Sequence, residues 1–297
     1  MNSTTAQLLA EPELPPAPLR LAVVQTAATP GAVADNARRA AGLAADATAR
    51  GARVVILPEL HLCAYDLPTL AAAPADCEVA ADESGAITDR RLMPLAEVAA
   101  RTGTLVLTGA AIRRPDGRLT NSVVAAEPSG AVSAVYDKQH LWHADEARLF
   151  TAGEAGAALE ADGWRLGLSI CYDMSFPEHA RAAALSGAHA YLCLGAFASG
   201  NEHRAAVYLA ARALENTIFS LFANPVGGPA ARPTRGGSLV YAPDGTLAAE
   251  AGTDNEAMIL ADLDPTRMAE VRSFLHMLDE QRARCAPALP DLPHSGR

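Results

Sequence analysis

The chain has 297 residues, half of them hydrophobic, and carries a net charge of −10 because 34 acidic residues outnumber 24 basic ones. This length allows one large α/β domain or two ordinary ones, and the scattered basic residues argue against nucleic acid as a partner. The five cysteines include no CxxC pair, which argues against a disulfide framework or a zinc knuckle and favours the reducing cytoplasm as the location.

The sequence predicts neither a signal peptide nor a membrane span. Residues 1–18 contain no Lys or Arg and are interrupted by prolines, so we interpret them as a loose extension. Residues 182–201 contain no charged side chain over a length that is sufficient to span a bilayer. Glycines and polar residues interrupt this stretch, which therefore predicts a helix end, a buried strand and a loop.

Two similar strand-helix-strand units are predicted, one near the start of the chain and one in its middle. Their second strands are uninterrupted apolar runs, which are typical of strands covered on both faces in an α/β domain. The pattern indicates a weak internal duplication. The predicted elements of the two units are 19–25, 33–50 and 54–57, followed by 164–170, 177–185 and 190–194.

The other predicted elements are hairpins between the two units and a mixed region after them. Strands are expected at 104–112, 120–127, 132–136, 217–222, 237–241, 246–250 and 257–261, with helices at 203–215 and after Asp264. No linker separates these elements, so we expect one domain over residues 19–272. A Pro-rich tail over residues 273–297 follows and is available to pack on a partner subunit.

Cys171 closes the predicted strand 164–170 and is followed by a turn and by Pro177, a residue suited to the first turn of a helix. This is how a chain presents a nucleophile. A thiol near the positive end of that helix is expected to have a depressed pKa. The alternative is that Cys171 is a small buried apolar residue, as cysteine usually is.

Two further candidates follow predicted strands. Glu59 comes directly after an apolar strand, at the end where α/β sheets carry their sites, and a general base there needs a raised pKa. The alternative is a salt bridge or a helix cap. Lys138 is placed to donate to a developing oxyanion, although a lysine after a strand is usually solvated. Glu146, a little further along, is a candidate second carboxylate.

Taken together, these residues and their neighbours resemble the three signature blocks of the nitrilase, or carbon–nitrogen hydrolase, superfamily. The resemblance covers roughly residues 19–272. It implies a four-layer α-β-β-α sandwich that pairs into a homodimer or higher homo-oligomer, and catalysis without a metal or an organic cofactor. The three blocks are Leu57-Pro58-Glu59-Leu60, Tyr136-Asp137-Lys138-Gln139-His140-Leu141 and Ile170-Cys171-Tyr172-Asp173-Met174-Ser175-Phe176-Pro177-Glu178.

The resemblance also implies a role for each residue. Cys171 is the nucleophile, Glu59 the general base and acid, and Lys138 the oxyanion donor, helped by the backbone N–H of Tyr172. Glu146 is similar to the additional glutamate of the family, although the spacing after the lysine varies among its members.

The residues after the cysteine favour amide hydrolysis. Nitrilases tend to have Cys-Trp-Glu, whereas Cys171-Tyr172-Asp173 is similar to the amidase branches. The expected reaction cleaves a small primary amide to a carboxylate and ammonia through a thioester. An N-carbamoyl amine or amino acid is the alternative substrate, and a nitrile is a further one.

The sequence leaves the acyl group of the substrate unidentified. The chain departs from the pattern of the family in the segments that are expected to form the substrate pocket. Ala64-Tyr65 replaces the frequent Gly-Tyr, and residues 195–200 lack the usual Pro and Trp. Arg232 and Arg235 flank a Gly/Pro-rich loop and either meet an anionic substrate or are solvated. The candidate pocket residues are Tyr65, Trp142, Phe197 and Asn201, with His61, His143 and Glu202 as further candidates.

Two other classes of protein are alternatives. His140, His143, Asp145 and Glu146 suggest a metal cluster, but no HExxH motif or distant second His/Cys pair accompanies them. A non-catalytic assembly protein that kept only the fold is the other alternative, and the presence of all three triad residues argues against it.

Overall fold

The computed structural model describes residues 13–284 and contains two β-sheets that pack face to face. The first has the order β15-β1-β2-β4-β5-β6, with β3 paired to the far part of β4, and the second has the order β14-β13-β10-β9-β8-β7. The first sheet consists of β1 (Leu19–Gln25), β2 (Val54–Ile56), β3 (Glu78–Ala80), β4 (Leu105–Arg113), β5 (Leu119–Ala126), β6 (Val132–Asp137) and β15 (Ala257–Leu263). The second consists of β7 (Ala158–Ala161), β8 (Trp164–Ile170), β9 (Ala190–Leu194), β10 (Phe219–Ala223), β13 (Leu239–Tyr241) and β14 (Leu247–Glu250), and a separate ribbon pairs β11 (Val226–Gly227) with β12 (Thr234–Arg235).

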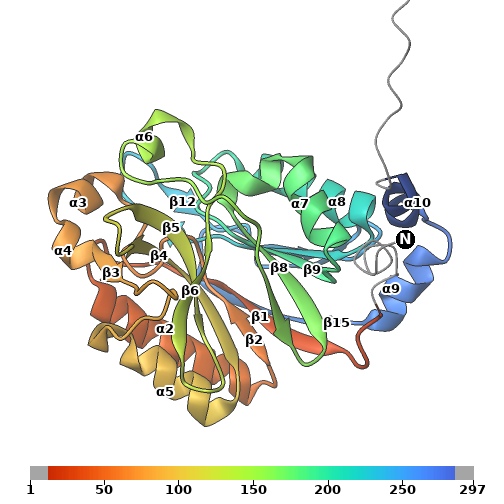
Figure 1. Cartoon of the computed structure of the whole chain (residues 1–297), viewed down its shortest axis with the longest axis horizontal. Helices are drawn as coiled ribbons and strands as arrows, with labels where there is room; N and C mark the ends of the chain where they lie inside the picture. The colour runs from red at the N-terminus through yellow and green to blue at the C-terminus, as the bar shows by residue number, and fades with distance from the viewer. Residues whose placement is uncertain (1–12, 285–297) are drawn as a thin grey trace, which may run out of the picture.

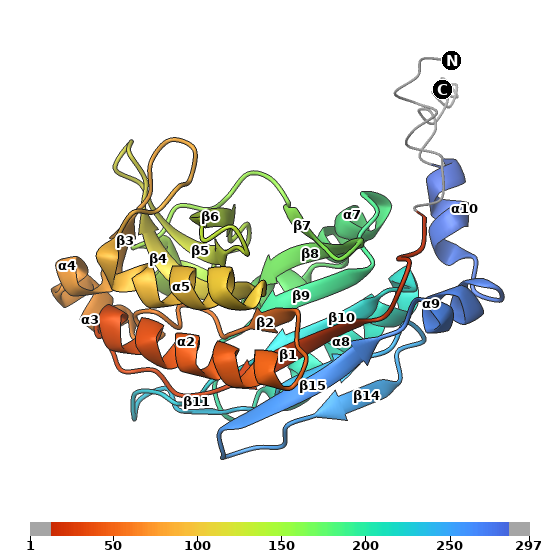
Figure 2. The same cartoon turned by 90° about the horizontal axis from the view of Figure 1, so that it is seen from below.

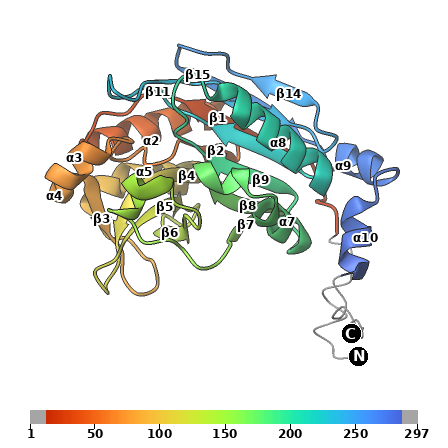
Figure 3. The same ribbon diagram turned by 90° about the horizontal axis from the view of Figure 1, so that it is seen from above.

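Helices cover the outer face of each sheet (Figures 1 and 3). The first sheet is covered by α2 (Val33–Ala49) and α5 (Met93–Thr102), and the second by α7 (Pro177–Leu185) and α8 (Glu202–Asn216). The shorter helices are α3 (Leu67–Ala72), α4 (Pro74–Cys77), α6 (His143–Ala147), α9 (Pro265–Arg272) and α10 (Met277–Arg284), with 3₁₀ turns η1 (Arg90–Leu92) and η2 (Cys171–Ser175).

Alternation along β1 shows how the layers form. Leu21 and Val23 belong to the core between the sheets, which also contains Trp164, whereas Ala22 and Val24 belong to the core under α2. Successive side chains of a strand point to opposite faces, so both faces of this strand are buried. The result is the four-layer α-β-β-α sandwich that the resemblance implied, and its pairing into a dimer stays a prediction.

Most predicted elements are confirmed, and β1, β8, α7 and β9 have the predicted bounds. The helix α5 was not predicted, although a proline in its first turn and Gly103 in the left-handed region (φ 66°) are ordinary helix start and stop signals. The strand predicted from residue 217 begins at Phe219 instead. Thr217 has a left-handed φ of 50° where α8 ends, so the chain turns before it becomes extended.

Segments outside the predicted domain contact it. The Trp164 indole donates to the Ala17 carbonyl (2.8 Å), and the His189 ring lies 3.0 Å from the Glu13 carbonyl. At the other end, α10 buries Leu278, and α9 and α10 lie together at one end of the sandwich (Figure 2). The predicted domain boundaries stay predictions, and residues 1–12 of the extension and 285–297 of the tail lie outside the described residues.

The uncharged stretch 182–201 divides as predicted into the end of α7, the buried strand β9 and the loop before α8. Within residues 13–284, no helix combines the length and apolar character needed to cross a membrane.

Candidate active site

The three signature blocks meet where three strands end. Glu59 follows β2, Lys138 follows β6 and Cys171 follows β8, so each reaches the same end of the sandwich. The Lys138 Nζ lies 2.7 Å from Glu59 Oε1 and 2.8 Å from Glu146 Oε1, and all three side chains are fully buried. The structure therefore brings together the predicted base, oxyanion donor and second carboxylate.

Backbone contacts between neighbouring strands hold Glu59. Its N–H donates to the Gly195 carbonyl (3.1 Å), and the Gly109 N–H donates to the Pro58 carbonyl (3.1 Å). A Cβ at Gly109 would lie only 2.2 Å from the Leu60 backbone nitrogen, so this position on β4 requires glycine. The turn also places Leu60 in the left-handed region, at φ 48°. Close packing of backbone against backbone thus fixes the direction of the Glu59 side chain.

Lys138 is held from both sides. Its N–H donates to the Asn121 carbonyl (2.8 Å), and its own carbonyl accepts from the Gly153 N–H (2.8 Å). Burial alone would lower the pKa of Lys138, but the charges of Glu59 and Glu146 raise it above the usual lysine value. The ammonium is therefore charged, and it can stabilise negative charge next to Cys171.

The two carboxylates differ in their free hydrogen-bonding capacity. Glu146 accepts from Tyr65 Oη (2.6 Å) and Lys138 through Oε1, and from the Trp142 N–H (2.7 Å) through Oε2. Glu59 accepts from Lys138 and from Asn121 Nδ2 (2.8 Å) through Oε1 alone. Its Oε2 is buried, with no hydrogen-bond partner among the described residues. Glu59 is therefore the carboxylate that is free to take up a proton.

Burial raises the pKa of Glu59 above the usual carboxyl value, while the Lys138 charge and the Cys171 thiol oppose the shift. A raised pKa is what a general base or acid near neutral pH requires.

Cys171 begins η2 with a left-handed φ of 48°, a conformation that non-glycine residues adopt at a cost. The expectation of a depressed thiol pKa is wrong. Burial and the nearby charge of Glu59 raise the pKa of Cys171 well above its usual value, although Lys138 opposes them. The helix α7 starts only at Pro177, after a 3₁₀ turn. The resting site thus holds a neutral thiol, which makes a general base necessary.

Asp173 links the nucleophile turn to the segment that carries Lys138, a role that the sequence did not indicate. Its Oδ2 accepts from the Ile170 N–H (3.0 Å) and from Tyr136 Oη (2.7 Å), and its Oδ1 accepts from the His140 N–H (2.9 Å). Burial would raise the pKa of Asp173, but hydrogen bonds from His140 and Tyr136 lower it. Asp173 is therefore an ionised side chain that joins β6 to β8.

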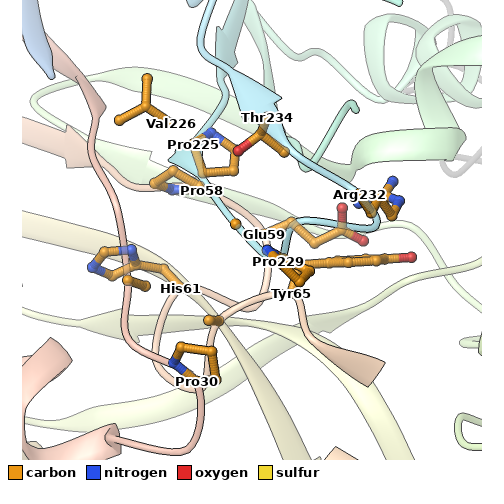
Figure 4. Close-up of a pocket in the computed structure, with 13 residues that line it drawn as sticks. Pro30, Pro58, Glu59, His61, Tyr65, Pro225, Val226, Pro229, Arg232 and Thr234 are labelled. Carbon is orange, nitrogen blue, oxygen red and sulfur yellow. The ribbon is translucent and has the colours of Figure 1, made fainter. Parts of the chain in front are cut away.

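Glu59 lines one cavity, which shares residues with a second, and neither lining includes Lys138 or Cys171. The smaller, of about 140 Å³, lies beside Glu59 and is also lined by His61, Tyr65 and Arg232 (Figure 4). The larger, of about 460 Å³, includes Trp142 and shares Tyr65, Pro229 and Arg232 with the first. These shared residues form the rim of the candidate site. Tyr65 and Trp142 thus line cavities beside the site, and their contact with a substrate stays a prediction.

The other predicted pocket residues lie elsewhere. Phe197 and Asn201 line neither of these two cavities. Phe197 is buried against Phe222, and the Asn201 amide donates to the Ala198 carbonyl (3.2 Å). His143 packs on the Trp142 ring, and Glu202 accepts from the Gly200 N–H.

The proposed metal cluster is divided in the structure. The His140 ring faces Asp173 and stacks on Phe176, whereas Glu146 binds Lys138. Among residues 13–284, no group of three or more His, Cys, Asp or Glu side chains is arranged to hold a metal ion.

Comparison with known proteins identifies the family of this chain. A sequence model of the carbon-nitrogen hydrolase family matches residues 20–273. A Pseudomonas protegens protein described as a hydrolase in the pqqF 5′ region is 36% identical over 265 residues, which is 89% of each chain. The human omega-amidase is 29% identical, with 89% of this chain and 95% of that protein covered.

A solved structure of the amidase from Nesterenkonia sp. AN1 is similar to this chain over most of its length. It superposes with a TM-score of 0.73 at 28% identity, covering 89% of this chain and 99% of that chain. That structure shows covalent addition of the acetamide moiety of fluoroacetamide at its active-site cysteine. The chain therefore belongs to the carbon–nitrogen hydrolase family and is a cysteine-dependent amidase.

Proposed function

We propose that this amidase hydrolyses a small primary amide to a carboxylate and ammonia through a thioester on Cys171. The observation that carries the proposal is the buried Lys138 ammonium, which bridges Glu59 and Glu146 while Glu59 Oε2 stays without a partner. One carboxylate is thereby left to move a proton, and the other is held in place. The human relative is named for the hydrolysis of amides, which supports the same reaction class.

The first step forms the thioester. Glu59 takes the proton of the Cys171 thiol, and the sulfur attacks the amide carbonyl carbon. Negative charge develops on the carbonyl oxygen, where the Lys138 ammonium and the Tyr172 N–H stabilise it. The protonated Glu59 then gives its proton to the leaving nitrogen, the C–N bond breaks and ammonia departs.

The second step releases the acid. Glu59, again ionised, takes a proton from a water molecule, which attacks the thioester carbonyl through the same oxyanion site. The C–S bond breaks, the carboxylic acid leaves, and the proton on Glu59 returns to the Cys171 sulfur. Glu146 keeps Lys138 and Tyr65 in position throughout, because its three hydrogen bonds occupy both of its oxygens.

The size of the smaller cavity supports a small acyl group. A cavity of about 140 Å³ is similar to one that binds benzene in another protein. Its walls are mainly apolar, with prolines 30, 58, 225 and 229 among the lining residues. A short carbon chain fits this space.

The test is to measure ammonia release from one acyl series offered as the primary amide, the N-carbamoyl derivative and the nitrile. We expect the amide to have the highest kcat/KM. Attack of the thiolate on the nitrile with the same acyl chain forms a different first intermediate. This intermediate is a thioimidate, which must be hydrated before ammonia can leave. A nitrile or N-carbamoyl compound that exceeds the amide by tenfold, about 1.4 kcal/mol in transition-state energy, would exclude the proposed substrate class.

A further inference from the structure

Four buried polar side chains form a continuous series of hydrogen bonds from strand β9 to η2, the turn that carries the nucleophile. Tyr191 Oη lies 2.9 Å from His179 Nδ1, and His179 Nε2 lies 2.8 Å from Tyr136 Oη. Tyr136 Oη donates to Asp173 Oδ2 (2.7 Å), the same oxygen that accepts from the Ile170 N–H. All four residues are at most 8% exposed. The series therefore ends on the carboxylate that holds the start of the nucleophile turn.

The ionised Asp173 sets the direction of every hydrogen bond in this series. A carboxylate only accepts, so the hydroxyl proton of Tyr136 goes to Asp173, and the Tyr136 oxygen accepts from His179 Nε2–H. Burial lowers the pKa of His179, although the charge of Asp173 opposes this shift, so the ring is neutral at pH 7. A neutral imidazole has one N–H, so its Nδ1 accepts from Tyr191. All three donors therefore point toward Asp173.

His179 lies where the elements around the nucleophile meet. It belongs to the first turn of α7, and α7 packs on β8, β9 and η2 (Figure 1). Its two hydrogen-bond partners belong to other strands, because Tyr136 lies on β6, two residues before Lys138, and Tyr191 lies on β9. One ring thus connects a helix and two strands next to the turn that carries Cys171.

We propose that His179 is a positioning residue of this amidase, which acts on the nucleophile turn through Tyr136 and Asp173. His179 Nε2 donates to Tyr136 and so keeps the Tyr136 hydroxyl directed at Asp173. Asp173 in turn holds Ile170 at the start of the turn and His140 in the segment that carries the oxyanion donor. The inference rests on cysteine-dependent amide hydrolysis and holds whatever acyl group the substrate carries.

The two ends of the nucleophile turn are held by different groups. Asp173 holds its start, whereas Arg212 of α8 donates to the carbonyls of residues 174 and 175 (2.9 and 3.2 Å) near its end. Loss of His179 therefore loosens the start and leaves the end in place. Cys171 lies at that start with a left-handed φ of 48°, a conformation that persists only where the surroundings hold it. The expected consequence is a less well aligned thiol in a folded protein.

Two substitutions of His179 separate its two hydrogen bonds. The side-chain amide of glutamine reaches about as far as Nε2, and that of asparagine about as far as Nδ1. His179→Gln should keep the bond to Tyr136, whereas His179→Asn should keep only the bond to Tyr191. We expect kcat for amide hydrolysis to fall by about three- to tenfold in His179→Asn and His179→Leu, the range for one neutral hydrogen bond. In His179→Gln kcat should stay within about twofold, and KM should stay within about twofold in all three variants.

The second measurement is the rate at which iodoacetamide alkylates Cys171. This rate reports the presentation of the thiol and needs no turnover, so it tests His179 even with an amide that the protein does not hydrolyse. We expect it to fall in His179→Asn and His179→Leu by about the same factor as kcat. Absence of ammonia release from every amide, with these alkylation rates as expected, would overturn the proposed function and leave the inference intact.

His189 is the matched control, because it is buried and bridged in the same way at the other end of β9. It is 5% exposed, and burial lowers its pKa. Its Nδ1 accepts from the Arg165 N–H (2.9 Å), and its Nε2 lies 3.0 Å from the Glu13 carbonyl. His189→Asn should lower the urea midpoint about as much as His179→Asn, while kcat and the alkylation rate stay unchanged. Equal losses of kcat in these two variants would show a general effect of packing and would overturn the inference.

A double substitution tests the route through Tyr136. Tyr136→Phe already breaks the series, so adding His179→Leu should lower kcat by less than a further twofold or so. Full additivity of the two losses would show that His179 acts by another route, and an equal loss in His179→Gln and His179→Asn would show the same. If His179→Asn and His179→Leu do not fold by circular dichroism, Tyr136→Phe decides. A fall in kcat of about three- to tenfold with an unchanged KM then supports the inference, and an unchanged kcat overturns it.

Discussion

The catalytic centre and its rim are held in place in different ways. Glu59, Lys138 and Cys171 lie just past the ends of strands and are buried, and hydrogen bonds to neighbouring backbone segments fix Glu59 and Lys138. Tyr65 and Arg232 lie on loops, are only half-buried, and are held by ring stacking and single hydrogen bonds. Strand ends cannot move without disturbing the core, whereas loops tolerate change. The residues proposed for the chemistry therefore lie at strand ends, and the residues of the rim lie on loops.

The largest effect that this contrast predicts is loss of the nucleophile. Cys171→Ala should abolish ammonia release, because Cys171 is the thiol at the turn after β8, whereas the neighbouring Cys193 lies within β9 and burial raises the pKa of its thiol to about 12. Cys63→Ala is the matched control, since Cys63 is buried under α2 and burial raises the pKa of its thiol to about 12. Iodoacetamide labelling located by mass spectrometry should fall on Cys171. Full activity in folded Cys171→Ala would refute the mechanism.

The next effect is loss of the base. Glu59→Gln keeps the shape of the side chain and an oxygen that accepts from Lys138, so the protein should fold while kcat falls by about a hundredfold or more. Lys138→Ala is a poorer test, because it leaves two buried carboxylates unpaired at a cost of about 3–5 kcal/mol. Glu160→Gln, at an exposed ion pair with Arg165, serves as the control and should leave kcat unchanged.

A smaller loss is expected when the centre keeps its reacting groups but loses their alignment. Asp173→Asn weakens the bonds that join β8 to β6, so kcat should fall by about tenfold while KM changes little. The variant should also lose about 1–3 kcal/mol in the free energy of unfolding, measured with urea, because buried donors lose an ionised acceptor. An unchanged kcat would show that Asp173 does not position the nucleophile turn.

The pH dependence tests the coupling between the two carboxylates. Because burial raises the pKa of Glu59, kcat/KM should rise with pH through a midpoint above the ordinary glutamate value of about 4.3. The charge of Glu146 contributes to this raised pKa. Glu146→Gln should therefore make ionisation of Glu59 easier and move the acid limb of the profile to lower pH. A shift to higher pH would contradict the assigned electrostatics.

The smallest effect is expected at Trp142, which lines the larger cavity next to the rim. Trp142→Leu removes a ring that packs on Tyr172 and lies under Arg204, but leaves the backbone N–H that binds Glu146. We expect KM to rise by about three- to tenfold, from lost apolar contact of about 1 kcal/mol, with kcat within twofold. A large fall in kcat with an unchanged KM would mean that Trp142 takes part in the chemistry.

Local patterns predicted much of the fold. The alternation of large apolar side chains predicted β8, and Pro177 with the following apolar residues predicted α7, both with the observed bounds. The short helix α6 was not predicted, since five residues of mixed polarity carry no periodic signal. For that reason the sequence suggested Glu146 as a second carboxylate but did not show that it binds Lys138, Tyr65 and the Trp142 N–H.

The sequence by itself determined where the three candidate residues lie and in which order, because Glu59, Lys138 and Cys171 each follow an apolar strand whose pattern is local, while their roles are what the resemblance to the family implies. Only the tertiary structure decided the state of the thiol and the position of Arg232. The pKa of Cys171 depends on burial and on Glu59, more than a hundred residues away in the chain. The charge of Arg232 is available because the fold stacks it on Tyr65 and gives it no carboxylate among the described residues, and no local sequence pattern records either contact.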